Sequence, residues 1–360
     1  MVPIVRADAD GQSATRRWRG IAFVLRGWQQ DPKRLLYVLS FAAIAILLAA
    51  RPIGLALDDF SYLDYLDGAD WFQFIDYVQL RGFPLIIEEP LWQLLIHLLS
   101  SFLDSETAFR LIILSSVLMY SWAFRNAPSS ALLFALFAFV ACPSMLSQAY
   151  FNQVRQGFAN SILIVFLSLG EWGYVAGAAV AGLVHTAQLS LLPIYCKGKK
   201  GFAILAVAVL IGGAAIAAGI FESFLQNLDL GRREYYAFDS QLNYRFYIVT
   251  VPLYFGILGF VWYEHVRLKQ TPEPILFQTI IFCMVAIAVS LEFEAGGRLF
   301  YLLDVLVVWT LCRFWKGRVP LGAWLWACAQ LGLGFYLSAI QDFEPQTTWG
   351  RYGTIFSCWW

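Results

Sequence analysis

Charged residues are scarce in this 360-residue chain. Asp, Glu, Lys and Arg make up 14% of it and hydrophobic residues 59%, whereas typical soluble domains carry about 25% charged residues. The two signs of charge cancel to a formal net charge of zero, so no global field points to a nucleic-acid partner. We therefore expect an integral membrane protein that has no soluble domain and binds no nucleic acid.

Motifs for metal binding and for nucleophilic catalysis are missing from the sequence. The three histidines lie far apart, and no CxxC pair occurs among the six cysteines, which stand at Cys142, Cys196, Cys283, Cys312, Cys328 and Cys358. Neither a disulfide framework nor a zinc site is indicated. A glycine-rich phosphate loop and a serine nucleophile elbow are also missing. We predict no metal and no cofactor.

Long apolar runs recur along the chain at lengths that suit a bilayer, since a span needs roughly 20 mostly apolar residues. They occupy 35–50, 108–124, 131–149, 157–169, 173–195, 202–221, 246–263, 275–291, 299–314 and 321–340. The pattern predicts an all-α fold, a polytopic transmembrane helical bundle of about nine to eleven spans.

The segments outside these runs suggest an orientation and a domain organisation. The basic segment 1–34 is expected in the cytoplasm, because basic flanks stay on that side. A single transmembrane domain would then fill 35–340, with outer loops at 51–84, which suggests amphipathic helices, and at 222–245. The tail 341–360 is rich in tryptophan and tyrosine and is expected to be a periplasmic aromatic anchor.

Two segments, 85–103 and 173–195, leave two topologies open. If each crosses the membrane once, Arg155 lies in the cytoplasm. If both are broken or re-entrant, Arg155 faces outward and His185 is the tip of a hairpin. We favour the second topology, which requires that the irregular backbone lines a cavity.

Polar side chains lie at membrane depth in two of the apolar regions. Asn152, Arg155 and Gln156 belong to the stretch FNQVRQ, and His185 lies in the middle of the run 173–195. Ionisable residues at such depth are costly and mark functional sites by default. The alternatives are an arginine that reaches an interface and a histidine that is satisfied within the bundle.

This stretch carries a family resemblance. FNQVRQ, an apolar helix, a short turn, a second apolar run around His185, then PIY and the basic loop KGKK resemble the EpsG family. Members of that family are polytopic proteins of bacterial exopolysaccharide synthesis, regarded as Wzy-like polymerases. The resemblance implies the bacterial inner membrane, an oligosaccharide substrate on polyprenyl pyrophosphate, contact with membrane lipids, and flippase and chain-length regulator proteins as partners.

Acidic residues follow the first apolar run. Asp58 and Asp59 stand where the family has an aspartate, and their placement is similar to that of catalytic carboxylates in membrane glycosyltransferases of the GT-C fold, so a GT-C-like arrangement is a further expectation. A carboxylate could accept the proton of an attacking sugar hydroxyl; otherwise these aspartates solvate a surface helix. Glu89, before Pro90, matches an acidic family element and is predicted either to bind substrate or to favour a helix N-terminus.

Cations and aromatics in the loop GRREYYAFDSQLNYR suit phosphate capture and sugar stacking. Arg232, Arg233 and Tyr236 are the candidates there. The same composition equally suits a lipid headgroup interface.

The resemblance extends to two further elements. An arginine and an aromatic, here Arg298 and Tyr301, begin the run 299–314, and Tyr352 lies in the C-terminal GRYGTIFS. An ion pair of Arg298 with Asp304 or Glu294 is the structural alternative.

The predicted function is the polymerisation of lipid-linked oligosaccharide repeat units, with glycan transferred from polyprenyl pyrophosphate to a sugar hydroxyl on the periplasmic face. Arg155, together with Arg298, would bind the leaving pyrophosphate, Asp58 or Asp59 would orient or deprotonate the acceptor, and His185 would orient one of these groups or contact the sugar. Asn152 and Gln156 would hydrogen-bond sugar hydroxyls or hold the guanidinium. Two alternatives remain: a GT-C-like transferase of single sugars from polyprenyl phosphate, and a lipid-oligosaccharide flippase or transporter.

Overall fold

The computed structural model describes residues 31–56, 58–69, 75, 89–170, 172–195, 198–217, 244–268, 273–290, 299–314 and 319–340. All regular structure in these ranges is helical, which confirms the predicted helical class. The elements are α2 (Pro32–Ala50), α3 (Asp59–Asp67), α5 (Pro90–Ser100), α6 (Ser105–Ala123), α7 (Ser129–Ala141), η2 (Ser144–Asn152), α8 (Val154–Leu167), α9 (Gly173–Gly182), η3 (Thr186–Leu191), α10 (Gly198–Ala217), α13 (Tyr244–Arg267), α14 (Pro274–Ser290), α15 (Leu299–Phe314) and α16 (Leu321–Ile340).

Length and apolar character single out few of these helices as membrane spans. Among the described residues, α2 is long and apolar enough to cross a membrane, and α7 with η2 adds a second candidate if this bent pair counts as one span. Several other helices are apolar but shorter, among them α5, α8 and α9. The polytopic bundle of about nine to eleven spans therefore stays a prediction.

Helix ends follow local signals in the sequence. Pro32 opens α2, and the Asp31 side chain accepts a hydrogen bond from the Lys33 N–H at 3.1 Å. Asp104 caps α6 in the same way through the Thr107 N–H at 2.9 Å. An aspartate at this position satisfies backbone donors that the first helical turn leaves unpaired.

The run 131–149 is not one helix, contrary to the sequence expectation. It bends by 66° between α7 and the π-helix η2. The break falls at Cys142 and Pro143, where the proline cannot continue the backbone hydrogen bonding of α7.

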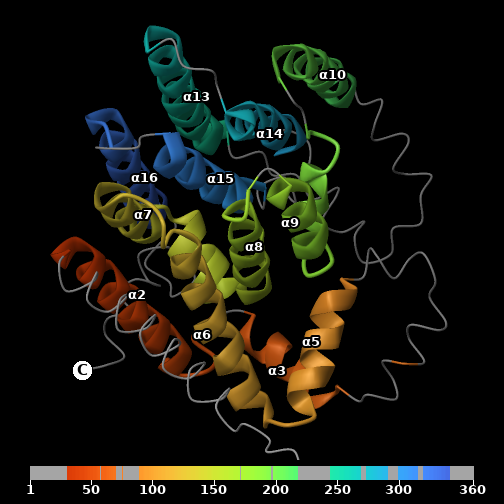
Figure 1. Cartoon of the computed structure of the whole chain (residues 1–360). Helices are drawn as coiled ribbons and strands as arrows, with labels where there is room; N and C mark the ends of the chain where they lie inside the picture. The colour runs from red at the N-terminus through yellow and green to blue at the C-terminus, as the bar shows by residue number, and fades with distance from the viewer. Residues whose placement is uncertain are drawn as a thin grey trace, which may run out of the picture.

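An aromatic cluster joins α2, α6, α7 and η2 in the core. Ring centroids lie 5.1 Å apart for Phe41 and Phe139, 4.8 Å for Tyr120 and Phe139, and 4.8 Å for Phe139 and Tyr150. Helix α6 packs against both α2 and α8, while α13, α14 and α10 lie at the far end of the molecule (Figure 1). The cluster fixes η2, and therefore the start of α8, against the N-terminal helices.

Two hairpins dominate the middle of the chain. The first folds α8 back on η2 around Gln153: the Tyr150 hydroxyl lies 2.8 Å from Ser161 Oγ, and a Cβ at Gly157 would lie 2.5 Å from the Ala149 carbonyl oxygen. Only glycine allows the two backbones to approach so closely.

The second hairpin joins α9 to η3. Its backbone is extended at His185, with φ −148° and ψ 115°, and the Tyr174 hydroxyl near the start of α9 donates to the carbonyl oxygen of Leu191 at the end of η3 at 3.1 Å. The chain therefore reverses at His185, and the run 173–195 is not one continuous helix. The side of a membrane on which this tip lies stays a prediction.

Candidate functional site

The site lies where three features of the fold meet: the start of α5, the start of α8 and the tip of the α9–η3 hairpin. Helix α9 packs against α8 (Figure 1), and the two run in opposite directions because the chain turns back after Leu167. The Leu91 N–H of α5 donates to the carbonyl oxygen of Leu183 at 2.9 Å. We call Tyr62, Glu89, Arg155, His185 and Thr186, which meet at this point, the Glu89 node.

The Glu89 carboxylate is the centre of the node. Its Oε1 accepts hydrogen bonds from His185 Nδ1 at 2.8 Å, the Thr186 N–H at 3.0 Å and the Thr186 hydroxyl at 3.4 Å. Its Oε2 lies 2.5 Å from Nη1 of Arg155. Since a carboxylate accepts and does not donate, His185 Nδ1 carries the hydrogen of this bond.

Charge and hydrogen bonding favour the ionised form of this carboxylate. Burial raises the pKa of Glu89, but the hydrogen bond from His185 and the positive charge of Arg155 lower it more, so the pKa lies below its ordinary value. Glu89 is 7% exposed and lies outside both candidate spans. The node is therefore a compact site in which a buried negative charge holds a partly exposed positive one.

The backbone of Glu89 is unusual. Its φ is 63° and ψ 59°, and it is the one residue other than glycine with a positive φ among those that the structure describes. Glu89 stands at the N-cap of α5, but its side chain makes no hydrogen bond to the first turn of that helix, so any contribution to the helix N-terminus is through its charge alone. A non-glycine residue persists in this conformation only where its surroundings hold it, and such residues cluster at functional sites.

Behind Arg155, buried amide side chains form a second layer. Oδ1 of Asn160 accepts hydrogen bonds from Nε2 of Gln156 at 2.9 Å and from Nε2 of Gln188 at 2.6 Å. Asn160 in turn donates to the backbone carbonyl of Tyr301 at 3.3 Å. Sequence analysis missed Asn160, although a second amide four residues after Gln156 shares one helix face with it.

Asp59 is enclosed, unlike a proton acceptor that substrate must reach. It is 0% exposed and forms a bidentate ion pair with Arg51, with 2.6 Å between Oδ1 and Nη2. Its Oδ2 also accepts the Gly54 N–H at 2.9 Å and the Ala56 N–H at 3.2 Å. Neither surface solvation nor ready access to a substrate hydroxyl fits this carboxylate.

Arg51 links that ion pair to the node, and sequence analysis missed it. Its Nη2 donates to the Phe151 carbonyl at 3.0 Å, just before the turn that leads to Arg155. The available signal was an arginine at the end of the first apolar run, eight residues before Asp59.

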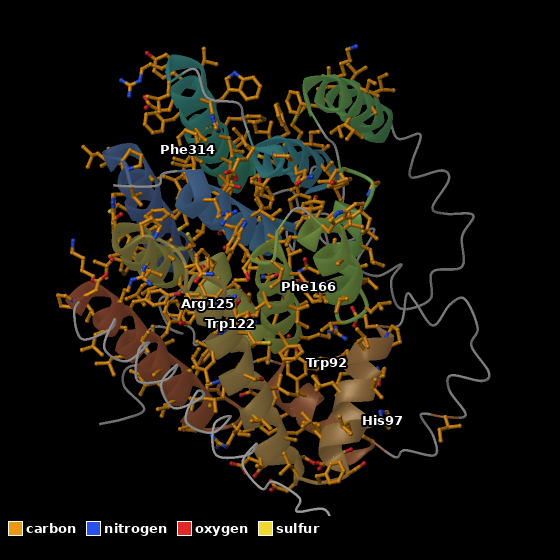
Figure 2. All side chains as sticks on the ribbon, in the orientation of Figure 1. Trp92, His97, Trp122, Arg125, Phe166 and Phe314 are labelled. Carbon is orange, nitrogen blue, oxygen red and sulfur yellow. The ribbon has the colours of Figure 1, made fainter. Side chains whose placement is uncertain are left out.

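Asp58 lies beside the node and is partly exposed. The Tyr62 hydroxyl accepts the backbone N–H of Arg155 at 3.3 Å. Burial chiefly raises the pKa of Tyr62 to about 12, and the charges of Asp58, Arg155 and Glu89 all act on it. Trp92, labelled in Figure 2 at the end of α5 that faces α8, packs edge-on against Tyr62 with ring centroids 5.8 Å apart.

The structure describes only some of the remaining sequence candidates. Asn152 is buried at the end of η2, and Asp304 of α15 accepts hydrogen bonds from Tyr254 at 2.5 Å and from Ser144. Outside the described residues lie Arg232, Arg233, Tyr236, Glu294, Arg298 and Tyr352. Within the described ranges no group of three His, Cys, Asp or Glu could hold a metal ion.

In the part of the chain that the structure describes, the protein is a helical protein with a charged, hydrogen-bonded site at the ends of apolar helices. The family model that matches is that of the EpsG family, over residues 34–340. The chain belongs to the EpsG family, as its sequence resemblance implies. Neither the curated proteins nor the solved structures contain a match.

Proposed function

We propose that this protein is a membrane glycosyltransferase of the bacterial inner membrane, with its N-terminus in the cytoplasm, that polymerises lipid-linked oligosaccharide repeat units in exopolysaccharide or O-antigen-type synthesis. Membership of the EpsG family supports a polysaccharide polymerase. The observation that carries the proposal is that the partly exposed Arg155 guanidinium of the node and the partly exposed Asp58 beside it both lie close enough to Tyr62 for their charges to act on its pKa. A flippase and a chain-length regulator are the expected protein partners.

The proposed reaction transfers the growing glycan from polyprenyl pyrophosphate to the next lipid-linked unit. An acceptor hydroxyl oxygen bonds to the anomeric carbon, and the bond from that carbon to the pyrophosphate oxygen breaks. The electron pair leaves with the pyrophosphate, and the hydroxyl proton passes to the Asp58 carboxylate. The Arg155 guanidinium stabilises the departing charge, most strongly where little water is present.

We assign the proton acceptor to Asp58 because Asp59 already accepts four hydrogen bonds and is enclosed. The acceptor oxygen of a general base has to come within hydrogen-bond reach of the substrate proton. His185 then acts through Glu89, by holding the carboxylate that positions Arg155. Gln156 supports the start of α8 through Asn160.

The proposal is tested by polymer analysis in cells that carry single variants in place of the wild-type gene. Arg155→Ala and Asp58→Asn are each expected to reduce polymer by about a hundredfold or more, at unchanged protein level in the membrane. Matched controls are Arg125→Ala, just beyond the C-terminal end of α6, and Asp64→Asn, exposed on α3. Both controls should leave polymer unchanged.

Wild-type polymer from Arg155→Ala would remove Arg155 from the site. Addition of one sugar by the wild-type protein, with no chain growth, would instead identify a transferase that uses a single-sugar donor.

A further inference from the structure

We propose that the Glu89 carboxylate occupies, as an internal counter-ion, the position on Arg155 that the pyrophosphate of the substrate takes, so that the ligand binds by exchange with Oε2 of Glu89. The identity of the ligand rests on the proposed function. The exchange itself rests on the contacts of Glu89 and Arg155. It predicts that the carboxylate weakens anion binding and, by returning to Arg155, speeds the release of the pyrophosphate product.

The two oxygens of Glu89 are held unequally. Oε1 has three donors, His185 Nδ1, the Thr186 N–H and the Thr186 hydroxyl, whereas among the described residues Arg155 is the one partner of Oε2. Loss of Arg155 from Oε2 would therefore leave the carboxylate anchored in place by the hairpin tip. An ion pair of this kind can open on one side without releasing the other.

Arg155 is the partner that can move. Its side chain is 27% exposed, against 9% for that of Glu89. A guanidinium has five N–H donors, and the buried Nε of Arg155 has no hydrogen-bond partner among the described residues. Its backbone N–H is held by the Tyr62 hydroxyl, so the start of α8 stays fixed while the side chain turns.

The left-handed backbone of Glu89 indicates that the surrounding contacts hold its carboxylate in place against Arg155. The hydrogen bond from Leu91 N–H to the Leu183 carbonyl and the contacts of Oε1 hold this conformation against its intrinsic preference. Arg155 and phosphate oxygens form the same short, charge-assisted hydrogen bonds as arginine and carboxylate. The Glu89 oxygen therefore reproduces the chemistry of the ligand that displaces it.

The experiment is a titration of the purified full-length protein, in detergent, with inorganic pyrophosphate, in which isothermal calorimetry measures the binding. Glu89→Gln keeps the shape and can still accept from His185 and Thr186, but it removes the competing charge. We expect its dissociation constant to fall about tenfold or more, the effect of a like charge within about 4–6 Å. Arg155→Ala should abolish binding, and Glu106→Gln, an exposed carboxylate paired with Arg110, should bind as the wild type does.

Equal or weaker pyrophosphate binding by Glu89→Gln overturns the exchange. If Glu89→Gln is not monodisperse, Glu89→Asp takes its place. The shorter side chain withdraws its carboxylate from Arg155, so this variant protein should bind pyrophosphate more tightly than the wild type does. Equal affinity overturns the proposal.

Polymer analysis separates this inference from the proposed function. Tighter binding by Glu89→Gln in a protein whose wild type makes no polymer supports the exchange and refutes the polymerase. Polymer that depends on Arg155, with no gain in affinity from Glu89→Gln, refutes the exchange alone.

Discussion

Removal of the Asp59 carboxylate should destabilise the protein strongly, whereas removal of the exposed Asp64 carboxylate on the same helix should not. Asp59 compensates the buried Arg51, which is 3% exposed. An alanine at position 59 would leave that guanidinium charge buried without its counter-ion. It would also leave the N–H groups of Gly54 and Ala56 without their acceptor.

The magnitude follows from the enclosure of this pair. Breaking a buried ion pair by removing one partner costs about 3–5 kcal/mol. The N–H of the buried Ala56 adds to that cost, because an unsatisfied buried donor costs about 1–3 kcal/mol. We therefore expect Asp59→Ala to lower the melting temperature by on the order of 10 °C, and Asp64→Asn, at an exposed position on the same helix α3, to melt within about 1 °C of the wild type, since surface changes alter stability little.

The assay is thermal unfolding of the detergent-solubilised protein, with the double variant Arg51→Met/Asp59→Leu as the decisive comparison. Replacing both members of a buried pair by apolar residues is often neutral or stabilising. The double variant should therefore regain most of the stability that Asp59→Ala loses. A melting temperature of Asp59→Ala equal to that of the wild type would refute the enclosed ion pair.

Two further predictions concern the turns that precede and follow α8. Gly173→Ala should destabilise the protein by about 1–3 kcal/mol, because the new Cβ would overlap the Phe166 carbonyl oxygen. The control is Gly256→Ala, whose new Cβ would meet nothing within 4 Å. It should be neutral or stabilising in the same melting assay. A cysteine in place of Gln153, in an otherwise cysteine-free protein, should react with a membrane-impermeant thiol reagent from outside the cell, whereas one in place of Lys33 should react only after the inner face is opened. Labelling of position 153 from the inner face alone would refute the outward orientation of Arg155.

The helices themselves were largely predictable from sequence. The runs 35–50, 108–124 and 299–314 correspond closely to α2, α6 and α15, because apolar composition over such lengths and a capping or proline signal both favour helix. Pro143 is a local signal for the bend inside 131–149, but the apolar composition continues across it and predicts one continuous helix. Helix existence was therefore easier to predict than helix continuity.

The site was predictable in its parts but not in its pairings. Arg155 and His185 attracted attention because polar residues are costly at membrane depth, and Glu89 was a candidate substrate ligand. The sequence carries no signal that Glu89 bonds both of them, since His185 lies 96 residues away. The prominence of Asp59 was misleading for a related reason: its partner Arg51 became visible only once the turn between them was known.

The separation of Glu89 from its partners along the chain has a consequence for the synthesis and membrane insertion of the protein. At about 5–20 residues per second, the ribosome adds the 96 residues between Glu89 and His185 in roughly 5 to 20 seconds. Until Arg155 and then His185 have been added, the carboxylate lacks the cationic and donor groups that later surround it, and an unpaired charge is costly in hydrocarbon. The nascent α5 segment is therefore expected to stay in a wet environment, at the bilayer surface or within the insertion machinery, until the hairpin that ends at Leu191 has been made.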